Sequence, residues 1–358
     1  MGTMITKEWA RTHLKGVEGD ILPSFSADFS GLDADGIRHD VRLAQRHGFF
    51  AVFCGGPIIT KAEYKQLITT VCDEARGKML VSVVASEPTV EGNLDVLQHA
   101  EQAGCSHAMV ILRQGADSEK ELVANYRRII EGTNLGIILY AYASPAFKHL
   151  HRTGLPLGVY DELANLPNVI GVKLTQSMSA ATAMECCEVL SPRLIIDTAD
   201  LDMMMVLARS YPVQWTGQWL VEAIQSPQRP YVVDLVNQLA SRNISAASDL
   251  FWKIQPAYRA FADLQRPFLL RGSHPWTHMK YYQWCVGGNG GLLRADEHEK
   301  TPMVRNDRIA IHRNFEMIGI DASRDDEELF VVGRSNYAKN IRKTDLPELP
   351  AYHEGGTE

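Results

Sequence analysis

Short apolar runs recur along the chain, and each is followed by a segment that is more polar. Their lengths and their near-continuous apolar character are typical of buried strands. The eight runs are DILPSF (20–25), FFAVFC (49–54), MLVSVVAS (79–86), HAMVIL (107–112), GIILYAY (136–142), VIGVKLT (169–175), RLIIDT (193–198) and VQWTG (213–217).

The segments between the runs have apolar positions at helical spacing and polar opposite faces. Examples are GIRHDVRLAQRHG (36–48), KAEYKQLITTVCDEARG (61–77) and NLDVLQHAEQAG (93–104). Strands that alternate with helices form parallel sheets, and eight such units predict an α/β fold, a (β/α)8 TIM barrel. An open doubly wound sheet is the competing fold. Its GxGxxG fingerprint is absent after the first run, where the sequence is SADFSGLDADG.

Further helical segments follow the eighth run, and the last part of the chain is charged. We expect an N-terminal extension (1–17), the barrel (18–225), a C-terminal helical region with additional helices (226–320) and a charged C-terminal tail (321–358). We expect the tail to pack on the surface or on a neighbouring subunit.

Composition narrows the classes of protein that fit. The chain has 358 residues, of which 45% are hydrophobic and 22% charged, and these values are typical of globular proteins. The formal net charge of -7 argues against a nucleic-acid partner, since phosphate binding needs a basic face. The sequence has no signal-peptide pattern and no apolar run of membrane-spanning length, so we expect a cytoplasmic protein without a membrane partner.

The six cysteines are scattered and form neither a CxxC motif nor a Cys/His cluster with zinc-ligand spacing. We interpret them as buried free thiols in a reducing compartment.

One lysine interrupts the sixth apolar run, NVIGVKLTQS (168–177). In a barrel, alternate residues point inward, so Lys173 shares a face with Gly171 and Thr175, near the carboxyl end where barrel active sites lie. We expect Gly171 to leave room for the lysine stem. A buried, neutral amine suits Schiff-base chemistry with a carbonyl compound. The alternative is a lysine that reaches solvent or pairs with a carboxylate.

Tyrosines occupy the same end of the fifth run, ILYAYASP, where Tyr140 and Tyr142 share one face. A hydroxyl beside an imine can relay protons to the carbinolamine and to the reacting carbon. The alternative is aromatic core filling with a satisfied hydroxyl.

These motifs resemble the dihydrodipicolinate synthase and N-acetylneuraminate lyase superfamily of class I aldolases. IILYAYASP resembles the family's strand-five I-L-Y-N-x-P, and NVIGVKLTQS resembles its strand-six I-I-G-x-K-x-[TS]. PSF (23–25) stands where the family has T-P-F, and QPAYRAFADLQRPFLLRGSHPWTHMKYYQWCVGGNGGLLR resembles the C-terminal region. The likeness extends over about residues 18 to 320.

The resemblance implies that Lys173 forms an imine with a 2-oxo acid such as pyruvate, with Tyr140 as proton relay and Tyr142 as its local rival. It also implies a homo-oligomer, typically a tetramer built from dimers, with no metal and no bound cofactor.

The chain departs from the family at the loop that binds the substrate carboxylate, usually G-T-T-G-E. In this chain the loop reads FCGGPIITKAEY and lacks the two threonine hydroxyls. Pro57 in this loop has no backbone N–H to donate. Gly55 and Gly56 still offer N–H groups to an anion, and Ser24 offers a hydroxyl. The alternative for the glycines is a tight turn.

Two further departures concern the branch of the family. ILRQGADSEKE has Arg113 and Gln114 where the synthases place a tyrosine that reaches a neighbouring subunit. The arginine after strand five has no clear match, although Lys148, His149, His151 and Arg152 lie nearby. YASPAFK is similar to the Y-A-N-P-x-A-F-K of the hydratase-aldolase branch, which argues against a role in lysine biosynthesis.

Other residues are candidates for binding the substrate. Thr175, Thr198 and Trp215 lie near the expected mouth of the barrel. For Thr198, with Asp197 and Asp200, the alternative is a solvated loop and helix cap. For Trp215 and Trp219, the alternative is that they fill the core. His274 and His278 lack a carboxylate at HExxH spacing, and we interpret them as packing residues.

The sequence therefore predicts a lyase of the aldolase type, with an imine on Lys173 and proton transfer by Tyr140. A dehydratase or hydratase-aldolase shares the same first steps. A non-catalytic barrel that binds 2-oxo acids is an alternative of another class, because of the altered loop. A metal-dependent barrel enzyme is a third alternative, but no cluster of metal ligands in the sequence supports it.

Overall fold

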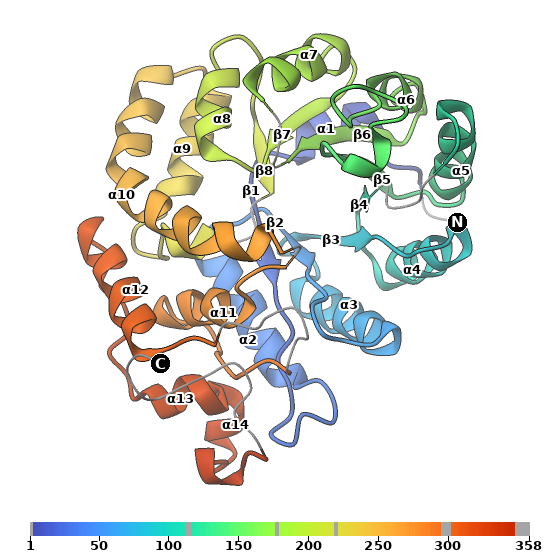
Figure 1. Cartoon of the computed structure of the whole chain (residues 1–358). Helices are drawn as coiled ribbons and strands as arrows, with labels where there is room; N and C mark the ends of the chain where they lie inside the picture. The colour runs from blue at the N-terminus through green and yellow to red at the C-terminus, as the bar shows by residue number, and fades with distance from the viewer. Residues whose placement is uncertain are drawn as a thin grey trace.

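The computed structural model describes residues 3–111, 116–175, 179–217, 221–271, 273–294 and 302–347. Within them, eight parallel strands curve into a barrel surrounded by helices, which confirms the predicted (β/α)8 fold (Figure 1). The strands are β1 (Gly16–Ile21), β2 (Ala51–Cys54), β3 (Leu80–Ala85), β4 (His107–Ile111), β5 (Gly136–Ala141), β6 (Val169–Leu174), β7 (Ile195–Thr198) and β8 (Trp215–Gly217).

Helices α2 to α8 follow the strands in turn. Their bounds are α2 (Ala34–Arg46), α3 (Lys61–Ala75), α4 (Val90–Ala103), α5 (Glu119–Glu131), α6 (Leu157–Leu163), α7 (Ala180–Leu190) and α8 (Leu201–Leu207), with 3-10 turns η1 (Pro145–Phe147) and η2 (Val221–Ala223) after β5 and β8. Several begin at a side-chain cap. Thr60 accepts from the backbone N–H of Glu63 and Glu63 caps Thr60 in return, which satisfies donors that the first turn of α3 leaves unpaired.

The ladder of strands runs from β7 through β6, β5, β4, β3, β2 and β1 to β8. Side chains connect the two ends of this ladder. The N–H of Gly217 in β8 donates to Asp197 Oδ2 in β7 at 3.0 Å, and the Thr216 hydroxyl donates to the Thr198 carbonyl at 3.3 Å. Asp197 therefore has a structural role at the closure of the barrel.

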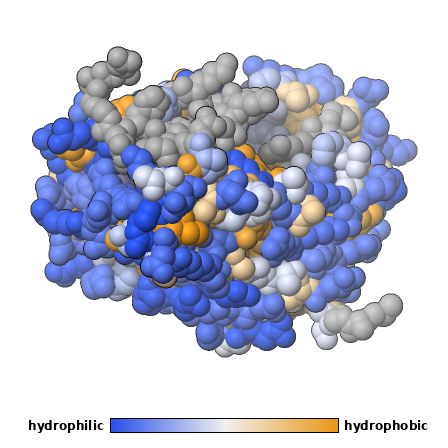
Figure 2. Space-filling model, turned by 90° about the horizontal axis from the view of Figure 1, so that it is seen from below, coloured by the Kyte–Doolittle hydropathy of each residue, from blue (hydrophilic) through white to orange (hydrophobic). Residues whose placement is uncertain are grey.

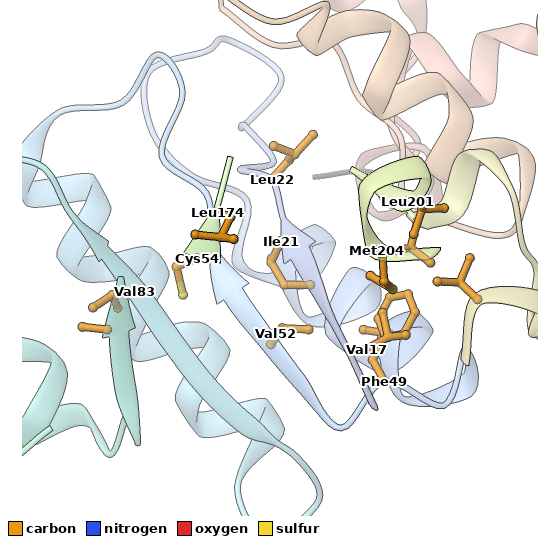
Figure 3. Packing of buried hydrophobic residues seen from close by; sticks show 14 of the residues in the cluster. Val17, Ile21, Leu22, Phe49, Val52, Cys54, Val83, Leu174, Leu201 and Met204 are labelled. Carbon is orange, nitrogen blue, oxygen red and sulfur yellow. The ribbon is translucent and has the colours of Figure 1, made fainter. Parts of the chain in front are cut away.

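The first strand differs from its predicted position. It spans residues 16–21 rather than 20–25, whereas the other seven strands begin within two residues of the predicted starts. Val17 and Ile21 pack outward against the helices (Figure 3), so Glu18 and Asp20 point into the barrel. Two inward carboxylates interrupt the apolar run on which the prediction depended.

The N-terminal segment packs against the lower end of the barrel. Ala10 in α1 (Lys7–His13) and the following Leu14 belong to one buried cluster with Phe53, Ile138 and other inward side chains. This cluster fills the interior below the level of Lys173. The carboxyl end of the barrel is therefore the end where a site can lie.

The C-terminal helices lie to one side of the barrel in Figure 1. They are α9 (Tyr231–Ala240), α10 (Ile244–Leu269), α11 (Trp276–Cys285), α12 (Arg305–Met317), α13 (Glu327–Val332) and α14 (Arg334–Ala338), followed by the 3-10 turn η3 (Lys343–Asp345). The described part of the tail packs on its own chain, since Ser335 and Lys339 bond to Asp33 at the start of α2. Residues 348–358 of the expected tail lie outside the described residues.

Three observations limit the kinds of site that the described residues can form. They include no helix that is both long and apolar enough to cross a membrane. They also include no group of three or more histidine, cysteine or acidic side chains placed to hold a metal ion. The face in Figure 2 is mostly hydrophilic, with small separate apolar patches.

Candidate active site

Lys173 lies inside the barrel near the carboxyl end of β6. Its Cα is paired with Tyr140 of β5 on one side and with Asp197 of β7 on the other. The side chain is 1% exposed, and its Nζ lies 5.6 Å from the ring centre of Phe53 and 6.0 Å from that of Tyr140. It forms no hydrogen bond or ion pair with a described residue. The prediction of an inward, buried lysine is confirmed, whereas Ile138 and Ile195 fill the space next to Gly171 that we expected for its stem.

The surroundings favour the neutral amine. Burial lowers the pKa of Lys173, because the ammonium form loses its hydration inside the barrel. The carboxylates of Asp197, Glu18 and Asp20 act in the opposite direction, but the pKa remains below its ordinary value of 10.5. A neutral amine is the form that attacks a carbonyl carbon.

Glu18 is a buried carboxylate directly below the lysine. A Cβ placed on Gly217 would lie 3.3 Å from Glu18 Oε2 and 3.5 Å from Lys173 Nζ. Glu18 accepts a hydrogen bond from the Ser82 hydroxyl, its Oε1 lies 3.1 Å from His107 Nε2, and the Trp215 indole N–H donates to Oε2 at 3.1 Å. Burial raises the pKa of Glu18, but the charge of His107 and these hydrogen bonds outweigh that effect and lower it. Glu18 is thus a fixed negative charge.

Asp197 and Glu222 are buried acids of a different kind. Burial raises the pKa of Asp197 to about 6 and that of Glu222 to about 7. Asp197 Oδ1 and Glu222 Oε2 have no hydrogen-bond partner among the described residues. Both groups therefore change protonation state near neutral pH, where an acid or base in a site is useful.

The two candidate tyrosines lie together. Their ring centres are 5.8 Å apart and meet edge to face, so Tyr140 and Tyr142 share one side of the mouth as expected. The ring centre of Tyr140 lies 6.0 Å from the lysine amine. The choice of Tyr140 over Tyr142 as the proton relay stays a prediction.

Most of the predicted substrate-binding side chains are engaged elsewhere. Ser24 accepts from Lys280 Nζ at 3.1 Å and from Asn289 at 3.3 Å. The Thr175 hydroxyl donates to the Ala141 carbonyl at 3.0 Å, and that of Thr198 donates to the Asp200 carbonyl at 2.6 Å. Asp200 caps α8, as the alternative interpretation of that loop expected.

Trp215 and the glycine loop have distinct positions. Trp215 is completely buried among inward apolar side chains and supports Glu18, a placement that favours its core-filling interpretation. Gly55 and Gly56 line a pocket of about 240 Å³ at the mouth, together with Tyr64 and Trp276. The N–H of Gly55 donates to the Ile21 carbonyl at 3.1 Å. Arg113, Gln114 and Trp219 lie outside the described residues.

The sequence analysis missed several polar residues of the interior. Glu18, Asp20, Ser82 and His107 all point inward on β1, β3 and β4. A signal existed, because each interrupts or borders an apolar run as Lys173 does. His274, treated as a packing residue, is also notable. Burial and, to a smaller extent, the charge of Lys173 lower the pKa of His274 to about 4, so His274 is a neutral imidazole near the amine.

Comparisons with known proteins agree with the barrel fold. A family model described as the dihydrodipicolinate synthetase family matches residues 37–207. A 4-hydroxy-tetrahydrodipicolinate synthase of Methanothrix thermoacetophila is 26% identical over 69% of this chain and 81% of its own length. The enzyme of the same name from Chloroherpeton thalassium is 24% identical over 67% of this chain and 78% of its own length.

Solved structures share the fold at lower identity. YagE from E. coli K12, a prophage protein of the dihydrodipicolinic acid synthase family in complex with pyruvate, superposes with a TM-score of 0.69 at 17% identity, covering 86% of this chain and 99% of its own. N-acetylneuraminate lyase from Fusobacterium nucleatum gives a TM-score of 0.67 at 14% identity, with coverage of 86% and 99%. The chain is thus similar to the dihydrodipicolinate synthetase family over residues 37–207, and it shares the barrel fold of the solved structures.

Proposed function

We propose that the protein is a Schiff-base-forming carbon–carbon lyase in which Lys173 is the nucleophile and Tyr140 the proton relay. The observation that carries the proposal is a lysine amine that is buried inside a barrel, has no ion-pair partner among the described residues, and has a lowered pKa. The names of the relatives support an enzyme of the lyase type.

In the proposed reaction, the neutral amine adds to the carbonyl carbon, and the carbinolamine loses water to give an iminium ion. The iminium accepts the electron pair of the adjacent carbon–carbon bond as that bond breaks, which leaves an enamine. Protonation of the enamine carbon and hydrolysis release the product and restore the amine. In this proposal Tyr140 carries protons in these steps, and the distance of 6.0 Å between its ring centre and the amine supports the choice.

The superfamily supports a 2-oxo acid such as pyruvate as the first carbonyl compound to test. A dehydratase or hydratase-aldolase reaction on the same imine remains the alternative, and the likeness to the hydratase-aldolase branch remains a prediction. An assembly of identical subunits, either a dimer or a tetramer, also remains a prediction. One solved neighbour is described as a monomeric dihydrodipicolinate synthase variant.

The enamine step supplies the test. Enamine formation in D₂O exchanges the methyl protons of pyruvate or of another methyl ketone for deuterium, which ¹H NMR follows directly. We expect exchange with the wild-type protein and none above background with Lys173→Met. Lys61→Met, at a surface lysine paired with Asp95, is the control and should leave the rate unchanged. Exchange that survives in Lys173→Met would refute the proposal.

The same samples distinguish the other functions. An adduct on Lys173 without proton exchange or bond cleavage, across a panel of carbonyl compounds, would indicate a binding protein. Loss of water from a hydroxylated substrate with its carbon chain intact would indicate a dehydratase.

A further inference from the structure

Asp20 is a buried carboxylate at the mouth of the barrel, one inward position beyond Glu18 on β1. It is 1% exposed, and neither of its side-chain oxygens has a hydrogen-bond partner among the described residues. A buried carboxyl group without a partner is costly, so native proteins rarely retain one without a function. Asp20 is paired with Phe53 in the β1–β2 ladder, and the Phe53 ring centre lies 5.6 Å from Lys173 Nζ, so the two groups lie in one part of the barrel interior.

The carboxyl group of Asp20 fills the space above the glycine loop. A Cβ on Gly55 would lie 2.3 Å from Asp20 Oδ1 and 2.9 Å from Oδ2, closer than atoms can approach. A side chain at position 55 would therefore clash with the Asp20 carboxyl group in its present position. The resemblance puts the threonine hydroxyls of the carboxylate-binding loop in this region, so this chain has acceptor oxygens where donors are expected.

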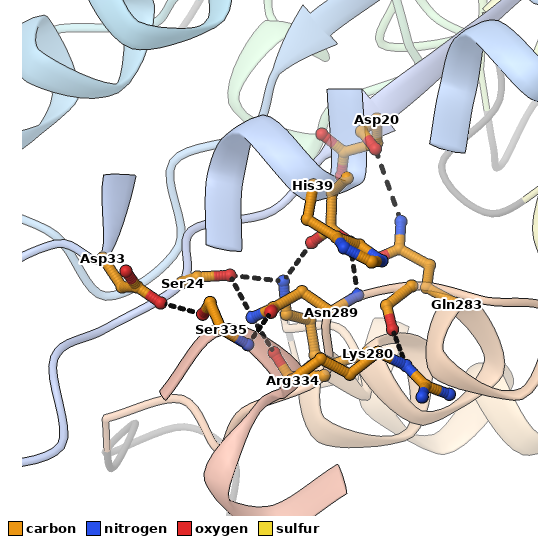
Figure 4. A network of polar contacts seen from close by, with 12 residues as sticks. Asp20, Ser24, Asp33, His39, Lys280, Gln283, Asn289, Arg334 and Ser335 are labelled. Carbon is orange, nitrogen blue, oxygen red and sulfur yellow. Dashed lines mark hydrogen bonds and ion pairs between the residues drawn. The ribbon is translucent and has the colours of Figure 1, made fainter. Parts of the chain in front are cut away.

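Neighbouring groups add further acceptors. Glu222 Oε2 and Gln283 Oε1 also have no partner among the described residues. The amide nitrogen of Gln283 donates to the Asp20 carbonyl at 3.3 Å (Figure 4). It also donates to Glu222 Oε1 at 3.4 Å, which joins the three residues into one cluster. The described atoms that remain available on this cluster are therefore oxygens.

The donors nearby are already engaged. Lys280 is as deeply buried as Lys173, but its Nζ lies 2.9 Å from Asp40 Oδ2 and donates to Ser24 (Figure 4). The N–H of Gly55 is bonded to the Ile21 carbonyl, and Pro57 has none. A substrate carboxylate at this position would face the carboxyl oxygens of Asp20 and Glu222, and it could be held there only while one of these acids keeps its proton.

We infer that the substrate end next to Asp20 has a hydroxyl group in place of a carboxylate, so the preferred carbonyl compound is an α-hydroxy ketone or α-hydroxy aldehyde. Its hydroxyl donates a hydrogen bond to Asp20 while its carbonyl carbon forms the imine with Lys173. This inference rests on the proposed function and replaces the 2-oxo acid with an α-hydroxy carbonyl compound as the preferred substrate.

The protonation state of Asp20 agrees with this choice. Burial raises the pKa of Asp20 well above its ordinary value, and the nearby Glu222 raises it further. A hydroxyl can pair with the ionised carboxylate as a donor and with the neutral acid as donor or acceptor. A substrate carboxylate can pair with the neutral acid alone.

Pyruvate and hydroxyacetone form a matched pair for the test, because they differ only in having a carboxylate or a hydroxymethyl group on the same methyl ketone. Both are offered together with sodium cyanoborohydride, and the two reduced adducts on Lys173 are quantified by peptide mass spectrometry. The same mixture with N-acetyl-lysine corrects for the intrinsic reactivity of the ketones. After correction, we expect the hydroxyacetone adduct to exceed the pyruvate adduct by at least about tenfold in the wild type, the discrimination of one charged or unpaired buried group.

Asp20→Asn tests the cause of the preference. The amide offers a permanent donor to a carboxylate and needs no bound proton, so the ratio should shift toward pyruvate by about tenfold or more. Asp73→Asn, at an exposed carboxylate in α3, is the control and should leave the ratio unchanged. Acetone has neither group and provides a test that needs no variant. The wild-type protein should trap acetone less than hydroxyacetone.

Each result has a separate meaning. A wild-type preference for pyruvate would overturn the inference and leave the imine mechanism intact. An unchanged ratio in a folded Asp20→Asn protein, or equal trapping of acetone and hydroxyacetone, would also overturn it. Failure of every ketone to label Lys173 in folded wild-type protein would refute the proposed function itself.

Discussion

Asp197→Asn separates the electrostatic cost of a buried carboxylate from its role in closing the barrel. Asp197 is fully buried, and its Oδ2 accepts the Gly217 N–H at 3.0 Å. The asparagine side chain has the same shape, and its carbonyl oxygen can accept this hydrogen bond. The substitution therefore removes the charge while it keeps the contact between β7 and β8.

The magnitude follows from the pKa of the acid. Burial raises the pKa of Asp197 from its ordinary 3.8 to about 6. Because the folded-state pKa is raised, the stability linked to this proton is complete below about pH 3.8 and is lost as the pH rises through 6. A gap of about two pKa units corresponds to about 3 kcal/mol at pH 8.

The assay is urea unfolding of both proteins between pH 4 and pH 8, evaluated as the difference in free energy of unfolding, Asp197→Asn minus wild type. Any pH-independent cost of the new amide cancels in the change of this difference with pH. We expect the difference to increase by about 2.5 kcal/mol from pH 4 to pH 8, since about 0.5 kcal/mol is already lost at pH 4. A difference that stays constant or decreases would refute the reasoning.

Asp28 offers a control of opposite sign. Hydrogen bonds from Ser26 and Ser30 lower the pKa of this exposed carboxyl to about 2. Its contribution to stability is present above its unfolded-state pKa of 3.8 and is lost as the pH falls through 2. Asp28→Asn should therefore be less stable than the wild type at pH 8, and the difference should shrink toward low pH.

Three further substitutions test other parts of the site. Tyr140→Phe should slow the deuterium exchange of a methyl ketone by about 100-fold, which is a typical contribution of a proton-transfer group. Tyr142→Phe should slow the exchange less, and the reverse order would assign the relay to Tyr142. Gly55→Ala should lower the free energy of unfolding in urea by about 1–3 kcal/mol, because the new Cβ collides with Asp20. Asp20→Ala in the same chain should restore this stability, and additive losses of stability in the double-mutant cycle would contradict the contact. Trp215→Phe should cost about 1–3 kcal/mol because it removes a donor from the buried Glu18 carboxylate, and a change below about 0.5 kcal/mol would show that this bond is unimportant.

The repeating units of the barrel could be predicted because most strands are buried on both faces. Strands such as β5 and β6 are almost continuously apolar, and this pattern stands out against the amphipathic helices. The same pattern made Lys173 conspicuous. The alternation of side chains was then sufficient to place it inside the barrel, near the carboxyl end of β6.

The contacts within the polar interior could not be predicted in the same way. Glu18 contacts Ser82, His107 and Trp215, which are 64, 89 and 197 positions away. Contacts of this range depend on the closed barrel and leave no local periodicity. Inward charges on β1 also displaced its predicted position, since Glu18 and Asp20 interrupt the apolar run that marks a strand.

The altered glycine loop shows a further limit. Its sequence indicated that donors to a carboxylate were missing, but it contained no information on what had replaced them. The replacement, Asp20, is about thirty-five positions earlier in the chain and meets Gly55 because β1 and β2 are adjacent. Ser24, predicted to supply a hydroxyl to the substrate, is instead bonded to Lys280 and Asn289.

Reductive trapping on two buried lysines tests the central claim most directly. Lys173 and Lys280 are each 1% exposed, but Lys280 is paired with Asp40, whereas Lys173 has no ion-pair partner among the described residues. After treatment with a small ketone and sodium cyanoborohydride, peptide mapping should find the reduced adduct on Lys173 and none on Lys280. An adduct on Lys280 in place of Lys173, or labelling that is equal in the wild type and in Lys173→Met, would contradict an imine at Lys173.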